Sequence, residues 1–137
     1  MSVPAKRKVL SPQEYCPIRQ TLSLLGKRWT ILIIKEIYFS SHKKLAFNEL
    51  RKKLGSASAK VLSERLKEMI DAGIIKRKAV NSEQKRVYYS LTPKGDDACH
   101  IIDEMKKYGL KWGGKETFDC DKVDCEFCIN YSPKEVK

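Results

Sequence analysis

The sequence predicts an α+β fold that is mostly α: a winged helix-turn-helix with flanking dimerisation helices. Two short amphipathic helices separated by a turn occupy residues 46–73, and two β-rich segments follow at residues 74–80 and 86–91. A helix, a turn, a second helix and then a two-stranded basic ribbon is the element order of a winged helix. The 137 residues are enough for one core that needs neither disulfides nor metal.

The two helices of residues 46–73 have clear sequence boundaries. The first has an apolar stripe at helical spacing and a terminal glycine, formed by Phe47, Leu50, Leu54 and Gly55. For the second, Ser56 and Ser58 are N-cap candidates and Gly73 supplies the left-handed stop. Its predicted inner face contains Leu62, Leu66, Met69 and Ile70. An ordinary helical hairpin would show the same periodicity, and the ribbon that follows favours the winged helix.

Positive charge is concentrated on this part of the chain. Residues 15–95 contain 18 Lys and Arg against 6 Asp and Glu, whereas residues 96–137 contain 7 against 10. A basic run is often only a solvated face, but a basic surface on a helix-turn-helix pattern points to phosphates. Nucleic acid is therefore the expected partner.

Five short motifs occur in one order along the chain: Cys16-Pro17-Ile18, Gly26-Lys27-Arg28-Trp29-Thr30, Phe47-Asn48-Glu49-Leu50, Ser63-Glu64-Arg65-Leu66-Lys67-Glu68 and Val87-Tyr88-Tyr89-Ser90-Leu91-Thr92-Pro93-Lys94-Gly95. Together they resemble the HxlR-type regulators, winged-helix relatives of the MarR group, over roughly residues 15–112. The resemblance implies a sequence-specific transcriptional regulator that binds double-stranded DNA, at a palindromic operator, as a homodimer.

The second helix, about residues 58–72, is expected in the major groove, and the wing, about residues 74–91, on the backbone or minor groove. On that helix and the turn before it, the expected DNA-binding residues are Ser56, Ser58, Lys60, Val61, Glu64, Arg65 and Lys67. On the first helix and the wing, the expected contacts are Arg51, Lys52, Lys53, Arg77, Lys78, Lys85 and Arg86.

Helices are predicted on both sides of the winged helix. A helix beginning at Pro17 has Ile18, Leu22 and Leu25 as its inner stripe. Residues 28–39 are apolar on nearly all sides; their β-branched density also suits a strand, but their length favours a buried helix with Trp29 as a core anchor. The last helix begins at Thr92-Pro93 and has an apolar seam. In the family resembled, terminal helices form the dimer interface, which implies interface roles for Ile101, Ile102, Met105, Tyr108 and Trp112.

The five cysteines permit two kinds of thiol chemistry. Cys16 lies at a predicted helix N-terminus near Arg19, which favours the thiolate, and several members of the family resembled sense oxidants or electrophiles there. A buried inert cysteine is an equal alternative. Cys120, Cys125 and Cys128 form a C-x4-C-x2-C pattern that suits zinc or redox chemistry but lacks a fourth ligand downstream. An incidental tail is the alternative for these three.

The predicted organisation is a flexible basic arm at residues 1–14, the winged-helix and dimerisation domain at 15–112, and a Cys-rich acidic tail at 113–137. No secretory signal is apparent and the longest apolar run, residues 31–34, is far too short to span a bilayer, so a cytoplasmic protein without a membrane partner is expected. An alternative function is an RNA- or protein-binding module with a metal-binding or redox tail. An enzyme is disfavoured because the chain has no phosphate-binding glycine loop and no nucleophile elbow.

Overall fold

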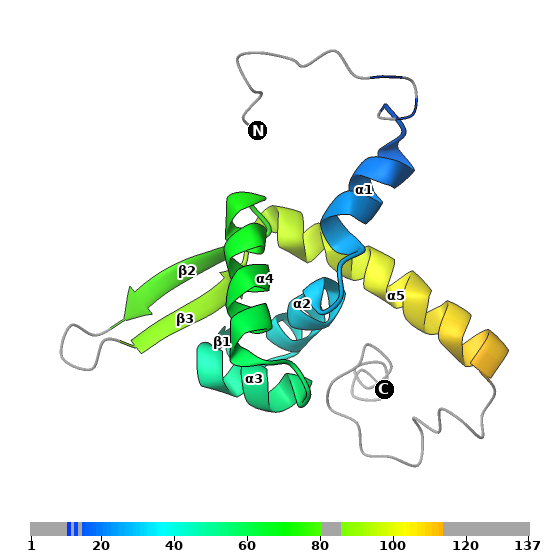
Figure 1. Ribbon diagram of the computed structural model, residues 1–137. Helices are drawn as coiled ribbons and strands as arrows, with labels where there is room; N and C mark the ends of the chain where they lie inside the picture. Colours follow the sequence, from blue (N-terminus) through cyan, green and yellow to red (C-terminus); the bar gives the residue numbers. More distant parts are fainter. Residues whose placement is uncertain (1–10, 12, 14, 81–85, 114–137) are drawn as a thin grey trace.

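The computed structural model describes residues 11, 13, 15–80 and 86–113, and these form a group of helices with a small antiparallel sheet at one side (Figure 1). The predicted α+β, mostly helical fold is confirmed. In chain order the elements are α1 (Pro17–Leu25), α2 (Thr30–Tyr38), β1 (Lys44–Ala46), α3 (Phe47–Leu54), α4 (Ala59–Asp71), β2 (Ile75–Val80), β3 (Arg86–Leu91) and α5 (Pro93–Gly113). No helix among these residues is long and apolar enough to cross a membrane.

The core surrounds α2, which confirms a buried helix rather than a strand in this segment. Ile33, Ile34 and Ile37 of α2 are fully buried. They pack with buried apolar side chains of β1, α3, α4, β2 and α5 and of the residue before β2, namely Leu45, Leu50, Leu62, Leu66, Met69, Ile74, Ile75, Ala98, Cys99 and Ile102. Trp29 packs partly buried against this cluster, as predicted for a core anchor. Burial of a large apolar side chain contributes roughly 1.5–3 kcal/mol, so the three isoleucines of α2 supply a substantial part of the stability of this core.

The sheet has the strand order β1-β3-β2, and β1 was not predicted. β1 has only three residues and pairs with β3 through Lys44↔Ser90, Leu45↔Tyr89 and Ala46↔Tyr88. A segment this short contains too little alternation to be recognised in sequence. Its central residue, Leu45, is buried in the core, so β1 fixes the start of α3 against the sheet.

The helix-turn-helix is formed by α3 and α4, as predicted. The Ser58 hydroxyl caps α4 by accepting from the Val61 N–H at 3.1 Å, so Ser58 and not Ser56 is the N-cap. α4 ends at Asp71, and Gly73 follows with a φ of +76°, in the left-handed region that favours glycine. The next N–H, of Ile74, donates to Met69 O at 2.9 Å, and this reversal leads directly into β2.

The prediction that Ile18 and Leu22 face the core of their own chain is wrong. Both side chains are exposed, and α1 has no buried residue. Only its last turn, at Leu24 and Leu25, packs against the core cluster. The rest of α1 extends away from the winged helix, on the side opposite the β2–β3 hairpin (Figure 1). Periodicity identified an apolar face correctly but does not specify which molecule covers it.

Candidate nucleic-acid interface

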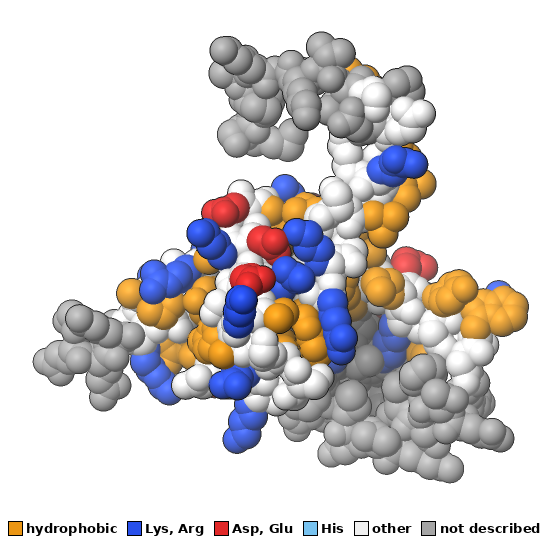
Figure 2. Space-filling model, in the orientation of Figure 1, with side chains coloured by type: hydrophobic (Ala, Val, Ile, Leu, Met, Phe, Trp, Pro, Cys, Tyr) orange, Lys and Arg blue, Asp and Glu red, His pale blue; other side chains and the backbone are white. Residues whose placement is uncertain are grey.

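The outward face of α4 is polar and starts at its capped N-terminus. Lys60, Glu64 and Lys67 are exposed, and Val61 is half-buried beside them. Leu62, Leu66 and Met69 on the inward face are buried, which fixes the rotation of the helix about its axis. The face that carries α4 shows many basic and few acidic side chains (Figure 2). α4 therefore presents hydrogen-bonding side chains outward from a rigid support.

α3 adds cations immediately before α4. Arg51 and Lys52 are exposed near the C-terminal end of α3, and Ser56 is exposed in the turn that follows. The carboxylate of Glu49, one turn earlier, accepts from the Ala46 N–H at 2.9 Å and so closes the start of α3. The structure thus brings the predicted cations of α3 next to the N-terminal turn of α4.

The β2–β3 hairpin divides the predicted wing cations between two faces. Lys78 pairs with Tyr88 and Arg77 with Tyr89 in the antiparallel register, and adjacent residues of a strand point to opposite faces. Lys78 therefore lies on the face of Tyr88 and Arg86, whereas Arg77 lies on the face of Tyr89. Lys85 lies outside the described residues.

The face of Tyr88 carries residues that the sequence interpretation missed. Lys44 Nζ lies 4.9 Å from the centroid of the Tyr88 ring, and the Arg86 guanidinium carbon lies 5.9 Å from it. Arg86 also donates to the Tyr88 hydroxyl at 3.3 Å. Lys76 is on the same face because it pairs with Ser90, which also pairs with Lys44. The two-residue alternation of a strand could have placed Lys76 on the same face as Lys78. The position of Lys44 could not be predicted, because it depends on β1, which the sequence did not reveal.

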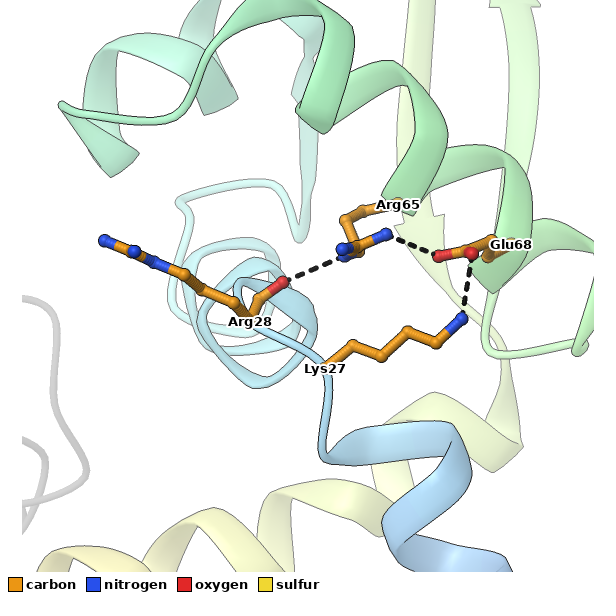
Figure 3. A network of polar contacts seen from close by, with 4 residues as sticks. All are labelled: Lys27, Arg28, Arg65 and Glu68. Carbon is orange, nitrogen blue, oxygen red and sulfur yellow. Dashed lines mark hydrogen bonds and ion pairs between the residues drawn. The ribbon is translucent and has the colours of Figure 1, made fainter.

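Arg65 does not join the outward residues of α4. Its Nε donates to Arg28 O at 3.0 Å, and its Nη1 lies 2.9 Å from a carboxylate oxygen of Glu68 (Figure 3). Lys27 Nζ lies 2.9 Å from the other oxygen of the same carboxylate. The hydrogen bond from Lys27, aided by that from Arg65, holds the pKa of Glu68 below its usual value. Arg65 is thus engaged within the chain, against the connection between α1 and α2.

Comparison with known proteins identifies the family of the protein that carries this surface. Residues 24–117 match the family described as HxlR-like helix-turn-helix. The chain belongs to the HxlR family. The HTH-type transcriptional regulator YvaP of Bacillus subtilis is 35% identical over 104 residues, which cover 75% of this chain and 94% of YvaP. Members with such names are transcriptional regulators, which are not a class of enzymes, and the chain is a DNA-binding regulator of this type.

Solved structures agree with this membership. A MarR-family regulator from Porphyromonas gingivalis W83 has a TM-score of 0.66 and 35% identity, covering 77% of this chain and 99% of its own. The reduced form of the regulator YodB from Bacillus subtilis has a TM-score of 0.63 and 33% identity, covering 71% and 93%. Other YodB structures are described as diamide-treated and quinone-bound. The solved structures similar to this chain therefore include one regulator in diamide-treated and quinone-bound forms.

The described cysteines occupy different environments. Cys16 is half-buried at the N-cap position of α1, directly before Pro17. Cys99 is buried in the core, and this burial, together with the nearby charge of Asp96, raises its pKa to about 11. Cys120, Cys125 and Cys128 lie outside the described residues. Among residues 15–80 and 86–113, no group of three or more His, Cys, Asp or Glu side chains is placed to hold a metal ion.

The apolar seam of α5 is largely uncovered. Ile101, Met105, Tyr108 and Trp112 are exposed, and the exposed fraction of Trp112 is 70%. Ile102 is instead buried in the core and reaches the surface only within a groove between α2 and α5. This groove of about 220 Å³ is apolar and is lined by Ile31, Leu32, Lys35, Phe39, Ile102, Met105 and Lys106. Neighbouring exposed apolar side chains of this kind often mark an interaction surface.

Proposed function

We propose that the protein regulates transcription as a homodimer that binds a palindromic operator in double-stranded DNA. The observation that carries this proposal is the outward face of α4, which joins a capped helix N-terminus to exposed polar side chains and lies beside cations of α3. An α-helix fits the major groove, where base edges present distinct patterns of donors and acceptors. Because a transcriptional regulator must reach the chromosome, we propose that this protein is located in the cytoplasm.

The residues nearest the bases in this proposal lie on the outward face of α4 and in the turn before it, and they are Ser56, Ser58, Lys60, Val61, Glu64 and Lys67. Lys60 suits a guanine edge and Glu64 suits a cytosine amino group. Arg65 is assigned to supporting α4, because its guanidinium already binds Arg28 O and Glu68. Preference among operator sequences should therefore depend on Lys60 and Glu64 more than on Arg65.

Phosphate contacts are assigned to cations outside the base-reading face. Arg51 and Lys52 come from α3, and the hairpin contributes Arg77, Lys78, Lys85 and Arg86. These contacts carry little sequence information, but each releases counterions and makes the affinity fall with salt. Replacement of Arg86 should weaken binding to all duplexes to a similar degree.

A second copy of the chain is the proposed cover for the apolar surfaces of α1 and α5. The exposed residues are of the kind that two-fold interfaces bury, Ile18, Leu22, Ile101, Met105, Tyr108 and Trp112. The groove between α2 and α5 continues this surface and adds Ile102 to it. Two-fold symmetry would place two α4 helices one duplex turn apart, roughly 34 Å, which is the reason for expecting a palindromic operator.

Cys16 is the proposed site of thiol responsiveness. It begins α1, the helix whose exposed apolar face belongs to the proposed interface, so its modification would act on the geometry of the dimer. The relative YodB, whose structures include diamide-treated and quinone-bound forms, supports this proposal. Cys99 is a poorer candidate because its thiol is buried.

The test is selection of a binding site from random duplexes, followed by sedimentation of the protein with and without that site. We expect a two-fold-symmetric sequence bound at least about 1,000-fold more tightly than random duplex at physiological salt. The complex should contain two chains per duplex. A selected site without symmetry, or a single chain per duplex, would contradict the proposal.

A further inference from the structure

α1 is attached to the winged helix over a narrow region. Its apolar face at Ile18 and Leu22 is exposed, and only Leu24 and Leu25 in its last turn pack against the core cluster. Beyond these contacts, its direction depends on the connection at residues 26–29. If α1 belongs to the dimer interface together with α5, this connection contributes to how each α4 is oriented relative to the two-fold axis.

The backbone conformation of residues 26–29 is restricted at both ends of the connection. The N–H of Gly26 donates to Leu22 O at 2.7 Å, and a Cβ at Gly26 would collide with that same oxygen. Trp29 follows with a φ of +82°, a left-handed conformation that bulky residues rarely adopt. The Arg28 guanidinium lies over the Trp29 ring, 4.7 Å from its centroid. A residue held in such a conformation indicates that surrounding contacts fix the backbone at this point.

Those contacts reach α4 through one carboxylate. Glu68 accepts from Lys27 at 2.9 Å with one oxygen and from Arg65 at 2.9 Å with the other. Arg65 also donates to Arg28 O at 3.0 Å, so the side chain of Arg65 and the salt bridge of Lys27 hold two successive residues of the connection (Figure 3). Glu68 and Arg65 both lie on α4, the helix proposed to read the bases. The network therefore joins the recognition helix directly to the base of α1.

We propose that Glu68 is a positioning residue that fixes the angle between α1 and α4 and thereby sets the half-site spacing that the dimer accepts. This inference rests on the dimer and the operator proposed above. α4 has 13 residues and is therefore about 20 Å long. A tilt of about 10° moves one end of such a helix by roughly 3.5 Å relative to the other, close to the base-pair step of about 3.4 Å. A small change at Glu68 is thus enough to shift the preferred spacing by one base pair.

The ion pairs of Glu68 are exposed to solvent, and for this reason we expect their loss to change the preferred half-site spacing of the dimer more than the stability of the fold. The side chains of Lys27 and Glu68 are 49% and 45% exposed, and ion pairs this exposed to solvent contribute little to folding. The same pair can still restrict orientation, because its two partners come from elements 41 residues apart in the chain. A purely structural surface pair would leave the spacing preference unchanged.

The experiment measures operator affinity as a function of half-site spacing. Duplexes contain the half-sites selected for the wild type at the selected spacing and at one or two base pairs more or fewer. The variants Glu68→Gln and Lys27→Met break the network. Lys27→Arg keeps a cation at position 27, and Asp71→Asn removes an equal charge from the end of α4 without touching the network. Thermal unfolding of each variant confirms that it is folded.

We expect the wild type to lose at least about tenfold in affinity when the spacing changes by one base pair, a loss comparable to one mismatched base pair. Glu68→Gln and Lys27→Met should reduce this discrimination to about threefold or shift its optimum, with the preferred bases within each half-site unchanged. Lys27→Arg and Asp71→Asn should retain the wild-type spacing profile. Melting temperatures should remain within about 5 °C of the wild type.

Two results would overturn the inference while leaving the proposed function intact. One is a Glu68→Gln protein with the wild-type spacing profile, and the other is a wild type that accepts all spacings equally. A wild type that prefers no symmetric duplex over random DNA would overturn both this inference and the proposed function. The preference for a symmetric site therefore tests the function, and the spacing profile tests Glu68.

Discussion

The winged helix buries its apolar side chains, whereas the helices that flank it leave side chains of the same types exposed. Leu62 in α4 is completely buried, whereas Leu22 in α1 is 60% exposed. Both leucines lie on the apolar stripe of an amphipathic helix, so the difference comes from what each helix packs against. The winged helix completes its core within one chain. Among the described residues, the apolar faces of α1 and of the outer half of α5 remain exposed, and this is the reason to expect a second copy.

The largest expected effect separates these two leucines. Leu62→Ala should reduce the free energy of unfolding by about 2–5 kcal/mol, because it leaves a cavity in a closed core. Leu22→Ala should cost less than about 1 kcal/mol in dilute protein. Urea denaturation measures both. The cost of Leu22→Ala should grow with protein concentration, because association stabilises the folded state by mass action. Equal costs for both variants in dilute protein would show that α1 is buried within its own chain.

A second pair of matched residues is Cys99 from the core and Cys16 from the start of α1. Burial raises the pKa of Cys99 from 9.0 to about 11, so its thiolate fraction at pH 8 is lowered about 100-fold. Iodoacetamide should therefore alkylate Cys99 at least about 100-fold more slowly than an ordinary thiol. Cys16, which is only half-buried, should react first.

Mass spectrometry of peptides from the folded protein, with protein unfolded in urea as the control, distinguishes the two thiols. In urea both should react at similar rates. Equal rates in the folded protein would show that the segment around Cys99 opens readily and would remove the contrast between the core and α1.

The third prediction concerns the exposed seam of α5. Replacement of Tyr108 and Trp112 together by Ser should raise the dissociation constant of the dimer at least about tenfold, because aromatic side chains contribute most at interface centres. Sedimentation at several concentrations measures it. Lys107→Ala, which breaks ion pairs with Asp103 and Glu104 on the same helix, serves as a surface control. An unchanged dissociation constant in the double variant would show that Tyr108 and Trp112 do not belong to the dimer interface.

The comparison also shows how far the sequence predicted the structure. Within the winged helix, helical spacing and the stop at Gly73 were sufficient, because each apolar stripe meets its partner in the same chain. The sequence did not reveal that Arg65 turns toward Arg28 O, since the two are 37 residues apart and only the folded chain brings the α1–α2 connection against α4. Lys44 was missed because β1 is too short to show a period. The exposure of Ile18 was missed because periodicity identifies an apolar face but not the surface that the face packs against.

A smaller effect tests the start of the recognition helix. Ser58→Ala should lower stability by about 1 kcal/mol, because the Val61 N–H loses its acceptor. Ser56→Ala, two residues earlier, is the matched control and should have almost no effect on stability, since Ser58 is the N-cap. Thermal denaturation of the two variants measures the difference. Equal losses would mean that the cap is shared between the two serines.

The smallest expected effect is the pH dependence of the link between α4 and the base of α1. Hydrogen bonds from Lys27 and Arg65 hold the pKa of Glu68 below its ordinary value of 4.5, although its side chain is exposed. Because the pKa is lower in the folded chain than in the unfolded one, the carboxylate stabilises the fold above pH 4.5. This contribution is lost as the pH falls through the folded-state value.

The melting temperatures of the wild type and of Glu68→Gln should therefore differ by a small, constant amount between about pH 6 and pH 8, and the difference should disappear as Glu68 is protonated below pH 4.5. Salt at about 1 M should also reduce the difference at neutral pH, because it screens exposed ion pairs. A difference that persisted unchanged at pH 3 would show that the shape of the Glu68 side chain, and not its charge, joins the two helices. The ion pair alone would then not explain how the connection between α1 and α2 is held against the recognition helix.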